Sequence, residues 1–346
     1  MTASPPSPLV IGLPGPDLSP DQRAAIADIR PVGLILFARN HESQDQVRRL
    51  VETFRTLVDL PEAVVMIDQE GGRVQQFRGH GWPDFPSFGR LGRLATDVGL
   101  DAARAAAREM SQAIGSGLKA HGIDTVCSPV IDLNQPEGHD VIGHRAFGAD
   151  PHIVTQMGQA VCDGFLTVGV TPILKHMPGH GRAPVDSHQA TPMVHTDLAT
   201  LDQTDFKPFK ALNTQPWAMV AHVVYPAVDG ERPASVSPTV VDQVIRHRIG
   251  YNGILISDCL YMKALSGSVP ERCAASLNAG LDLALACFGD HKDWRAFARA
   301  TGPIRPDSWV RLQADHQHRH THPITGPMDV DIKAVSETLQ ADLPVV

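Results

Sequence analysis

Short apolar runs recur along most of this chain, and each is closed by polar residues before an alanine-rich or amphipathic segment begins. Their spacing averages about 35 to 40 residues, enough for one strand, one helix and two connections. The eight runs span residues 8–13, 32–38, 63–68, 124–133, 171–176, 217–226, 253–258 and 281–287. Segments 101–122 and 152–169 between them are typical of helices, and the second ends in glycine. Eight such units predict an α/β fold, a single (β/α)8 barrel of the TIM type.

An open, doubly wound sheet is the alternative arrangement of strands and helices. It is disfavoured because no glycine-rich phosphate-binding turn follows the first run, as it does in dinucleotide-binding folds. We expect the barrel domain to span residues 1–302. Residues 303–346 are rich in proline and histidine, and we expect a C-terminal extension that packs on the barrel or trails from it.

Charge and hydropathy narrow the class of partner. The net charge is −8, and no basic patch of the kind that nucleic acids or anionic membranes attract is visible in the sequence. No run approaches the roughly 20 apolar residues of a membrane span, and residues 1–15 make a poor signal peptide. The five scattered cysteines fit reduced thiols. We therefore expect a cytoplasmic monomer that binds a small molecule, with no nucleic-acid or membrane partner.

Polar residues close several of the apolar runs. Active sites of (β/α)8 barrels lie where the strands end, so these residues should meet at one rim. A charge buried there costs several kcal/mol unless it is paired or used, which favours a functional reason for the set. The residues are Asp68, Asp132, Lys175, His176, His222 and Asp258.

The segment "KHMPGHGRAPVDSH", residues 175–188, follows the fifth run. Its glycines and prolines cannot sustain a helix or a central strand, so most of it should be a loop. A loop with three histidines, a lysine and an aspartate is either a working site or a metal site.

Six short motifs carry a resemblance to a known family: "IDQEGGRVQQF", "IGHRAFGADP", "KHMPGHG" with "DSH" five residues on, "MVAHVVYP", "PASVSP" and "GILISDCLYM". In this order and spacing, the chain resembles the bacterial β-N-acetylglucosaminidases (β-hexosaminidases) of glycoside hydrolase family 3 over residues 8–290. The resemblance implies a single barrel, a retaining mechanism, no cofactor and no metal. It also implies action on terminal β-linked N-acetylglucosamine, often joined to anhydro-N-acetylmuramic acid in recycled peptidoglycan, so the expected partner is a small muropeptide-derived carbohydrate.

The catalytic groups implied by the resemblance are Asp258, His188 and Asp186. Asp258 of "ISD" corresponds to the nucleophile, which would form a covalent glycosyl-enzyme. The acid/base corresponds to His188 on the loop, with Asp186 as its orienting partner. A histidine suits this role because its reference pKa of about 6.5 allows proton transfer in both directions near neutral pH.

Sugar-binding positions follow from the same resemblance. His222 is a further candidate for the pocket lining. His180 and Arg182 are left out, because their loop positions fit surface residues or loop-internal hydrogen bonds as well as substrate contacts. The positions expected to hydrogen-bond the hydroxyls of the sugar ring are Asp68, Arg145, Lys175 and His176.

The sequence departs from the family pattern at three positions. Cys259 follows the nucleophile where many relatives have a second aspartate, and His144 stands where an acidic residue is common. Tyr261 replaces a smaller residue and could reshape the aglycone side of the pocket. The preferred leaving group is therefore less constrained by the resemblance than the donor sugar.

Four other functions remain as alternatives, one of which is another β-glycosidase activity of family 3, such as cleavage of plain β-glucosides. A metal-dependent barrel hydrolase is suggested by the 17 histidines, but no H-x-H pair occurs before residue 300. A catalytically silent sugar-binding barrel would have lost the nucleophile or the His/Asp pair, and both are present. Within the enzyme class, phosphorolysis is the runner-up to hydrolysis, because a histidine acid/base does not repel phosphate.

Histidines occupy every second position from 316 to 322. Such a run can bind transition metals, although no cysteine or carboxylate cage accompanies it. In a strand, all four imidazoles would share one face.

Overall fold

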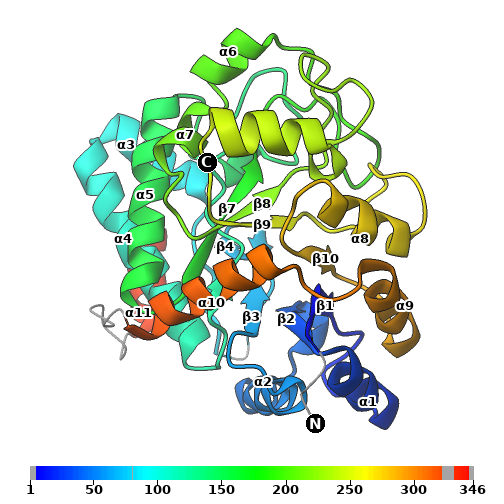
Figure 1. Cartoon of the computed structure of the whole chain (residues 1–346). Coiled ribbons are helices and arrows are strands. Elements are labelled where there is room, and N and C mark those ends of the chain that lie inside the picture. The colour runs from blue at the N-terminus through cyan, green and yellow to red at the C-terminus, as the bar shows by residue number, and fades with distance from the viewer. Residues whose placement is uncertain (1–4, 80, 322–330, 343–346) are drawn as a thin grey trace.

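The computed structural model describes residues 5–79, 81–321 and 331–342. Eight parallel strands form one sheet that curls into a barrel with helices outside it (Figure 1). The strands in spatial order are β10 (Ala284–Ala286), β1 (Ser7–Gly12), β2 (Pro31–Leu36), β3 (Val64–Ile67), β6 (Thr125–Val126), β7 (Thr171–Met177), β8 (Trp217–Val220) and β9 (Ile254–Ser257). A parallel bridge between Ile256 and Leu283 closes the ring. The predicted (β/α)8 barrel is confirmed.

The helices surround the barrel, and α4 and α5 run side by side along one flank (Figure 1). These two are the helices predicted from segments 101–122 and 152–169. The bounds are α1 (Pro20–Ile29), α2 (Gln44–Val58), α3 (Phe88–Asp97), α4 (Leu100–Lys119), α5 (Pro151–Thr167), α6 (Leu198–Gln203), α7 (Lys207–Ala211), η4 (Val240–Arg248), α8 (Val269–Asn278), α9 (His291–Thr301), α10 (Pro306–Thr321) and α11 (Ile332–Asp342).

Local sequence explains where these elements begin. Every residue of β1 and β2 is buried, as expected for parallel strands that are covered on both faces. Ser19 caps α1 by accepting from the backbone N–H of Gln22, whose side chain accepts from the backbone of Ser19 in return. At α5, the Asp150 side chain accepts from the backbone N–H of His152.

The fourth predicted strand, residues 124–133, is mostly irregular. Only Thr125 and Val126 form regular strand β6. Pro129 offers no N–H to a neighbouring strand, so the regular ladder stops before it. Beyond it the chain still follows β7, since the Ile131 N–H donates to the Lys175 carbonyl at 2.9 Å. Asp132 is therefore carried to the rim by irregular backbone.

Helix α10 packs on the barrel at the ends of the strands away from the rim. Ser308 Oγ donates to Asp282 at 2.7 Å, and Arg319 Nη1 lies 3.0 Å from Asp124 Oδ2. The domain boundary expected between residues 302 and 303 stays a prediction.

His316 and His318 fall on α10, where residues two positions apart are turned by about 200° around the helix. They therefore do not share the single face that a strand would give them. The side chain of His320 and the whole of His322 lie outside the described residues. Within the described part of the chain, no group of three or more His, Cys, Asp or Glu side chains is arranged to hold a metal ion.

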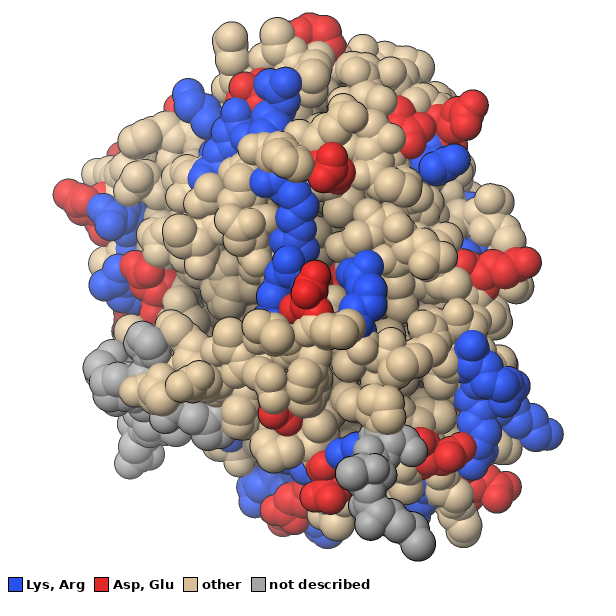
Figure 2. All heavy atoms as spheres, in the orientation of Figure 1, with Lys and Arg blue, Asp and Glu red and all other residues tan. Residues whose placement is uncertain are grey.

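The face of the molecule drawn in Figure 2 carries lysine and arginine side chains interspersed with aspartate and glutamate. Among the helices described in residues 5–79, 81–321 and 331–342, none combines the length and the apolar character needed to cross a membrane.

Candidate active site

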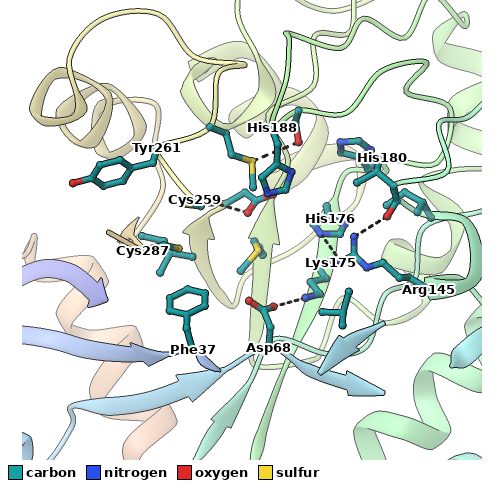
Figure 3. A pocket seen from close by; sticks show the side chains of 18 of the residues that line it. Phe37, Asp68, Arg145, Lys175, His176, His180, His188, Cys259, Tyr261 and Cys287 are labelled. Atoms are coloured by element: carbon teal, nitrogen blue, oxygen red, sulfur yellow. Dashed lines mark hydrogen bonds and ion pairs between the residues drawn. The ribbon is translucent and has the colours of Figure 1, made fainter. Parts of the chain in front are cut away.

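A cavity of about 390 Å³ opens at the carboxyl ends of the barrel strands (Figure 3). Its size lies within the range of small-molecule sites. Loops that follow β2, β3, β6, β7, β9 and β10 contribute to its wall. Of the predicted site residues, six line it: Asp68, Arg145, Lys175, His176, His188 and Asp258.

One half of the cavity holds a network of paired charges. Lys175 Nζ lies 2.7 Å from Asp68 Oδ1 and 2.6 Å from Glu70 Oε1. Arg145 binds Glu70 with two hydrogen bonds, of 3.0 and 2.8 Å, in the bidentate geometry that fixes a guanidinium against a carboxylate. Both cations are therefore held in place without a ligand.

The charges in this network decide its protonation. Burial alone would raise the pKa of Glu70, but Arg145 and Lys175 outweigh it and lower that pKa to about 2. Burial opposes the charge of Lys175, yet Asp68 and Glu70 hold its pKa above the ordinary value. Glu70, Lys175 and Arg145 are consequently charged near neutral pH.

Glu70 was not among the residues predicted from the sequence. It lies on β4 (Gln69–Gly71), which pairs with β5 (Val74–Gln75) in a hairpin directly after β3. The turn needs glycine at Gly71, where φ is +97° and a Cβ atom would lie 2.4 Å from the Pro86 carbonyl oxygen. The sequence did contain a signal for Glu70. The sugar-binding positions expected from the resemblance include two cations, Lys175 and Arg145, but only one carboxylate, Asp68, and each buried cation needs a counter-charge.

His176 is oriented by Asp132, which lies behind it. Its Nδ1 lies 2.7 Å from Asp132 Oδ2, and its backbone N–H donates to the same oxygen at 3.1 Å. Arg145 approaches Nε2 at 3.5 Å, and a guanidinium can only donate. The neutral tautomer consistent with both contacts carries its proton on Nδ1. Burial would raise the pKa of Asp132, but His176 outweighs it and keeps that carboxyl ionised.

Asp258 follows β9 and is buried at the cavity wall. Its Oδ1 accepts from the Cys259 backbone N–H at 2.7 Å. Burial would raise its pKa, but His176, His222 and this hydrogen bond, with a smaller contribution from His188, lower the pKa below the ordinary value. The carboxylate is thus ionised and available near neutral pH.

His188 lies on the loop after β7 and points into the cavity (Figure 3). Its Nδ1 lies 2.8 Å from Asp186 Oδ1, which also accepts from the His188 backbone N–H at 2.9 Å. The side chain is 61% exposed, so Nε2 remains open to a ligand. Asp186 does not line the cavity and acts on it only through His188.

The loop that carries His188 is docked on the segment after Asp258. The Ala264 N–H donates to the Ser187 carbonyl at 3.1 Å, and Thr191 Oγ1 donates to the Ala264 carbonyl at 2.8 Å. Ser187 Oγ approaches Met262 Sδ at 3.5 Å. These contacts couple the placement of His188 to that of Asp258.

His222 lies behind the cavity wall and is fully buried. Its Nδ1 lies 2.6 Å from Ser235 Oγ, and its Nε2 lies 3.0 Å from the Cys259 carbonyl oxygen. Burial lowers its pKa. A carbonyl only accepts, so Nε2 carries the proton, and the contact supports the backbone next to Asp258. His222 was expected to line the pocket, but the structure places it behind the cavity wall.

The two loop residues left out of the predicted site differ from one another. His180 is buried in the cavity wall, and burial, reinforced by His176, lowers its pKa to about 4. Arg182 points away into the loop, where Nε pairs with Asp205 at 2.7 Å and Nη1 pairs with Glu137. His180 therefore belongs to the site, whereas Arg182 stabilises the loop.

The other half of the cavity is apolar. Of the residues in this half, the sequence analysis identified only Cys259 and Tyr261. The others are apolar residues at strand ends, which cannot be distinguished by sequence from residues of the hydrophobic core. Its lining comprises Phe37, Leu285 and Cys287 as well as Cys259, Tyr261 and Phe288.

Comparisons with known proteins give a consistent result. A family model described as the glycosyl hydrolase family 3 N terminal domain matches residues 11–301. The chain is similar to a β-hexosaminidase of Thiobacillus denitrificans, at 38% identity over 307 residues that cover 85% of this chain and 84% of that protein. A β-hexosaminidase of Bordetella avium is 34% identical over 338 residues, which cover 92% and 95% of the two chains. The crystal structure of NagZ from Neisseria gonorrhoeae with N-trifluoroacetyl-D-glucosamine has a TM-score of 0.85 at 30% identity, over 99% of each chain.

Proposed function

Since the chain belongs to glycosyl hydrolase family 3, we propose that it is a retaining, exo-acting β-N-acetylglucosaminidase that works through a covalent glycosyl-aspartate. It is a glycoside hydrolase of the β-hexosaminidase type that acts on N-acetylhexosamine units. The observation that carries the finer proposal is the shared cavity: ionised Asp258 and His188, which Asp186 orients from behind, open on it beside a fixed polar network.

In the first step, the Asp258 carboxylate attacks the anomeric carbon while the glycosidic C–O bond breaks. The imidazolium form of His188 gives its Nε2 proton to the departing oxygen, because Nδ1 is engaged with Asp186. Asp186 holds the imidazole in the orientation that presents Nε2 to the cavity, the part that an aspartate plays behind a catalytic histidine.

In the second step, a water molecule attacks the anomeric carbon and His188, now neutral, takes its proton from the water. Asp258 departs as a carboxylate. The groups that lower the pKa of Asp258 also stabilise the departing carboxylate, so they assist release of the sugar. Both protons move through one nitrogen atom, and the two steps therefore need His188 in opposite protonation states.

The donor sugar binds in the polar half of the cavity. Asp68 keeps its second carboxylate oxygen for a hydroxyl donor, while Lys175 and Arg145 donate to hydroxyl oxygens. Because Glu70 and Asp132 already fix the cations and His176, little side-chain ordering remains for substrate binding.

The natural substrate is a muropeptide-derived GlcNAc-anhydroMurNAc unit, and the enzyme acts as a cytoplasmic monomer in peptidoglycan recycling. This part of the proposal is supported by the motif resemblance. A purified-enzyme assay on that disaccharide and on chitobiose checks it, because comparable turnover of both would remove the preference.

The central experiment is to trap the intermediate with a 2-fluoro glycosyl donor and to locate the adduct by peptide mass spectrometry. We expect it on Asp258, and we expect Asp258→Asn to lower turnover by at least about 10⁴-fold with the fold retained. Asp101→Asn, at a fully exposed helix position, is the matched control. An adduct on another residue contradicts the assignment.

A second experiment runs the turnover assay with and without phosphate. Hydrolysis releases the free sugar, whereas phosphorolysis releases the sugar 1-phosphate, so the product separates the two reactions.

A further inference from the structure

The apolar half of the cavity contains two aromatic rings in an ordered arrangement. Phe37 follows β2 and Phe288 follows β10, and their centroids lie 6.2 Å apart with an angle of 10° between the rings. Phe288 lines the cavity and is nevertheless 49% exposed to solvent. Figure 3 shows Phe37 on the side of the cavity opposite His176 and Arg145. An exposed aromatic side chain in a ligand cavity is a candidate contact surface.

Neighbouring groups hold both rings in place. The Arg39 guanidinium lies 4.4 Å from the centroid of Phe37 and 4.8 Å from that of Phe288. Arg39 is itself fixed, since Nε donates to the Leu13 carbonyl at 2.7 Å and Nη2 donates to the Cys287 carbonyl. Tyr261 packs edge-on against Phe288 at 5.5 Å. The two rings therefore form a preorganised surface, the aromatic ledge, defined here as Phe37 and Phe288.

The position of Asp258 determines what the ledge faces. His176 acts electrostatically on Asp258 from the polar half of the cavity, whereas Cys259, the next residue, lines the aromatic half. The nucleophile therefore lies at the junction of the two halves.

Asp258 attacks the anomeric carbon from the face opposite the glycosidic oxygen, so the leaving group departs on the side of His188. The loop that carries His188 is docked on Met262 and Ala264, next to Tyr261, which packs on Phe288. With the donor ring in the polar half, the leaving group therefore extends past His188 toward the ledge.

We propose that the aromatic ledge is the leaving-group subsite and that it stacks on the apolar C–H face of a second pyranose ring. This inference rests on the proposed function and adds the residues that select the leaving group. Flat aromatic side chains recognise flat apolar faces, and burial of Phe288 under the second ring removes exposed apolar surface from water. An aryl leaving group offers a similar face, and the experiment separates the two.

The experiment measures kcat/KM of the full chain and of Phe288→Ala on three β-N-acetylglucosaminides, whose leaving groups are methanol, a pyranose (as in chitobiose) and 4-nitrophenol. kcat/KM reports the steps up to bond cleavage, in which the leaving group is still present. We expect about a fivefold to tenfold loss on the disaccharide and less than twofold on the methyl glycoside. Phe37→Leu should reproduce the pattern more weakly. Inhibition by free N-acetylglucosamine, which occupies the donor side alone, should not change.

Val310→Ala removes an exposed apolar side chain far from the cavity, on α10, and should leave all three values unchanged. Equal losses on all three substrates, or no loss on the disaccharide, would overturn the subsite. A loss confined to the nitrophenyl substrate would overturn the assignment to a pyranose. If the unmodified chain turns over none of the three, the proposed function itself fails, which is a distinct result.

Discussion

At the scale of single residues, the proposed role of His188 as proton donor rests on the contact between its Nδ1 and Asp186. A general acid matters most for poor leaving groups and little for activated phenolates, and its help is worth about 10²- to 10⁴-fold. We therefore expect His188→Ala to lose about 10³-fold in kcat/KM on a disaccharide and far less on a nitrophenyl glycoside. Rate constants measured across leaving groups of graded acidity check this prediction.

Asp186→Ala serves as the companion variant, because it keeps the imidazole and removes only its orienting partner. It should give a milder version of the same dependence on leaving group. A uniform loss in both variants, whatever the leaving group, would mean that the histidine binds substrate or stabilises the loop and that the proton comes from elsewhere.

His180 provides a pH-dependent contribution to stability. Its pKa is about 4 in the folded protein, against an ordinary value of about 6.5. Between these values the unfolded chain binds a proton at this site and the folded protein does not, so its contribution is complete above pH 6.5 and is lost as pH falls toward 4. The full loss corresponds to at most about 3 kcal/mol. His180→Gln should flatten the free energy of unfolding over this window, measured by urea titration at a series of pH values.

His247→Gln is the matched surface substitution, at a side chain that is 74% exposed. It should leave the slope of stability against pH unchanged. A slope that is identical in the His180 variant and the unmodified chain would show that His180 takes up its proton equally in the folded and unfolded states.

At the scale of elements, the docking of the β7 loop on the β9 loop depends on few contacts. Thr191→Val keeps the shape of the side chain but removes the hydrogen bond to the Ala264 carbonyl. We expect a severalfold lower kcat/KM and faster proteolysis within the loop, because His188 spends less time over the cavity. Thr53→Val removes a comparable hydroxyl bond on the exposed face of α2 and should change neither property. Equal rates of loop proteolysis in Thr191→Val and the unmodified chain would show that this hydrogen bond does not hold the β7 loop on the β9 loop.

The sequence predicted the elements well where hydrophobic periodicity alone decides them, and less well where single residues interrupt it. Each of the eight apolar runs overlaps a barrel strand, because a run buried on both faces has few other options in a repeating β/α chain. Residues 124–133 gave only β6, because Pro129 breaks the ladder. Residues 217–226 gave β8 only to Val220, beyond which the chain leaves the sheet and buries His222. Strand ends, and hence side-chain directions, are set by tertiary contacts.

The same limit applies to the candidate site. Charged residues at strand ends could be identified from the sequence, since a charge in an apolar context is conspicuous. Glu70 was missed because its direction depends on the hairpin after β3, and Phe37 and Phe288 because their exposure becomes visible only in three dimensions. The functional roles of Asp258, His188 and Asp186 remain predictions until the variants above are measured.

At the scale of the whole molecule, α10 ties the C-terminal part of the chain to the barrel. Arg319 is buried and pairs with both Asp124 and Asp315. Arg319→Ala leaves two buried carboxylates with less compensation, so we expect a loss of about 3 kcal/mol in the free energy of unfolding. Arg295→Ala, which removes a more exposed pair with Asp28, should cost under about 1 kcal/mol. If chemical denaturation gives the same small loss in the free energy of unfolding for both variants, the contacts of α10 contribute little to the stability of the barrel.

The paired network of Asp68, Glu70, Lys175 and Arg145 sums to zero formal charge before any sugar arrives. An uncharged sugar that binds there displaces no counterion, and charges this deeply buried are screened little by dissolved salt. Affinity for the donor sugar should consequently vary little with ionic strength. The polar half of the cavity can thus work at the same efficiency in a dilute and in a concentrated electrolyte, which a site built on unpaired cations could not do.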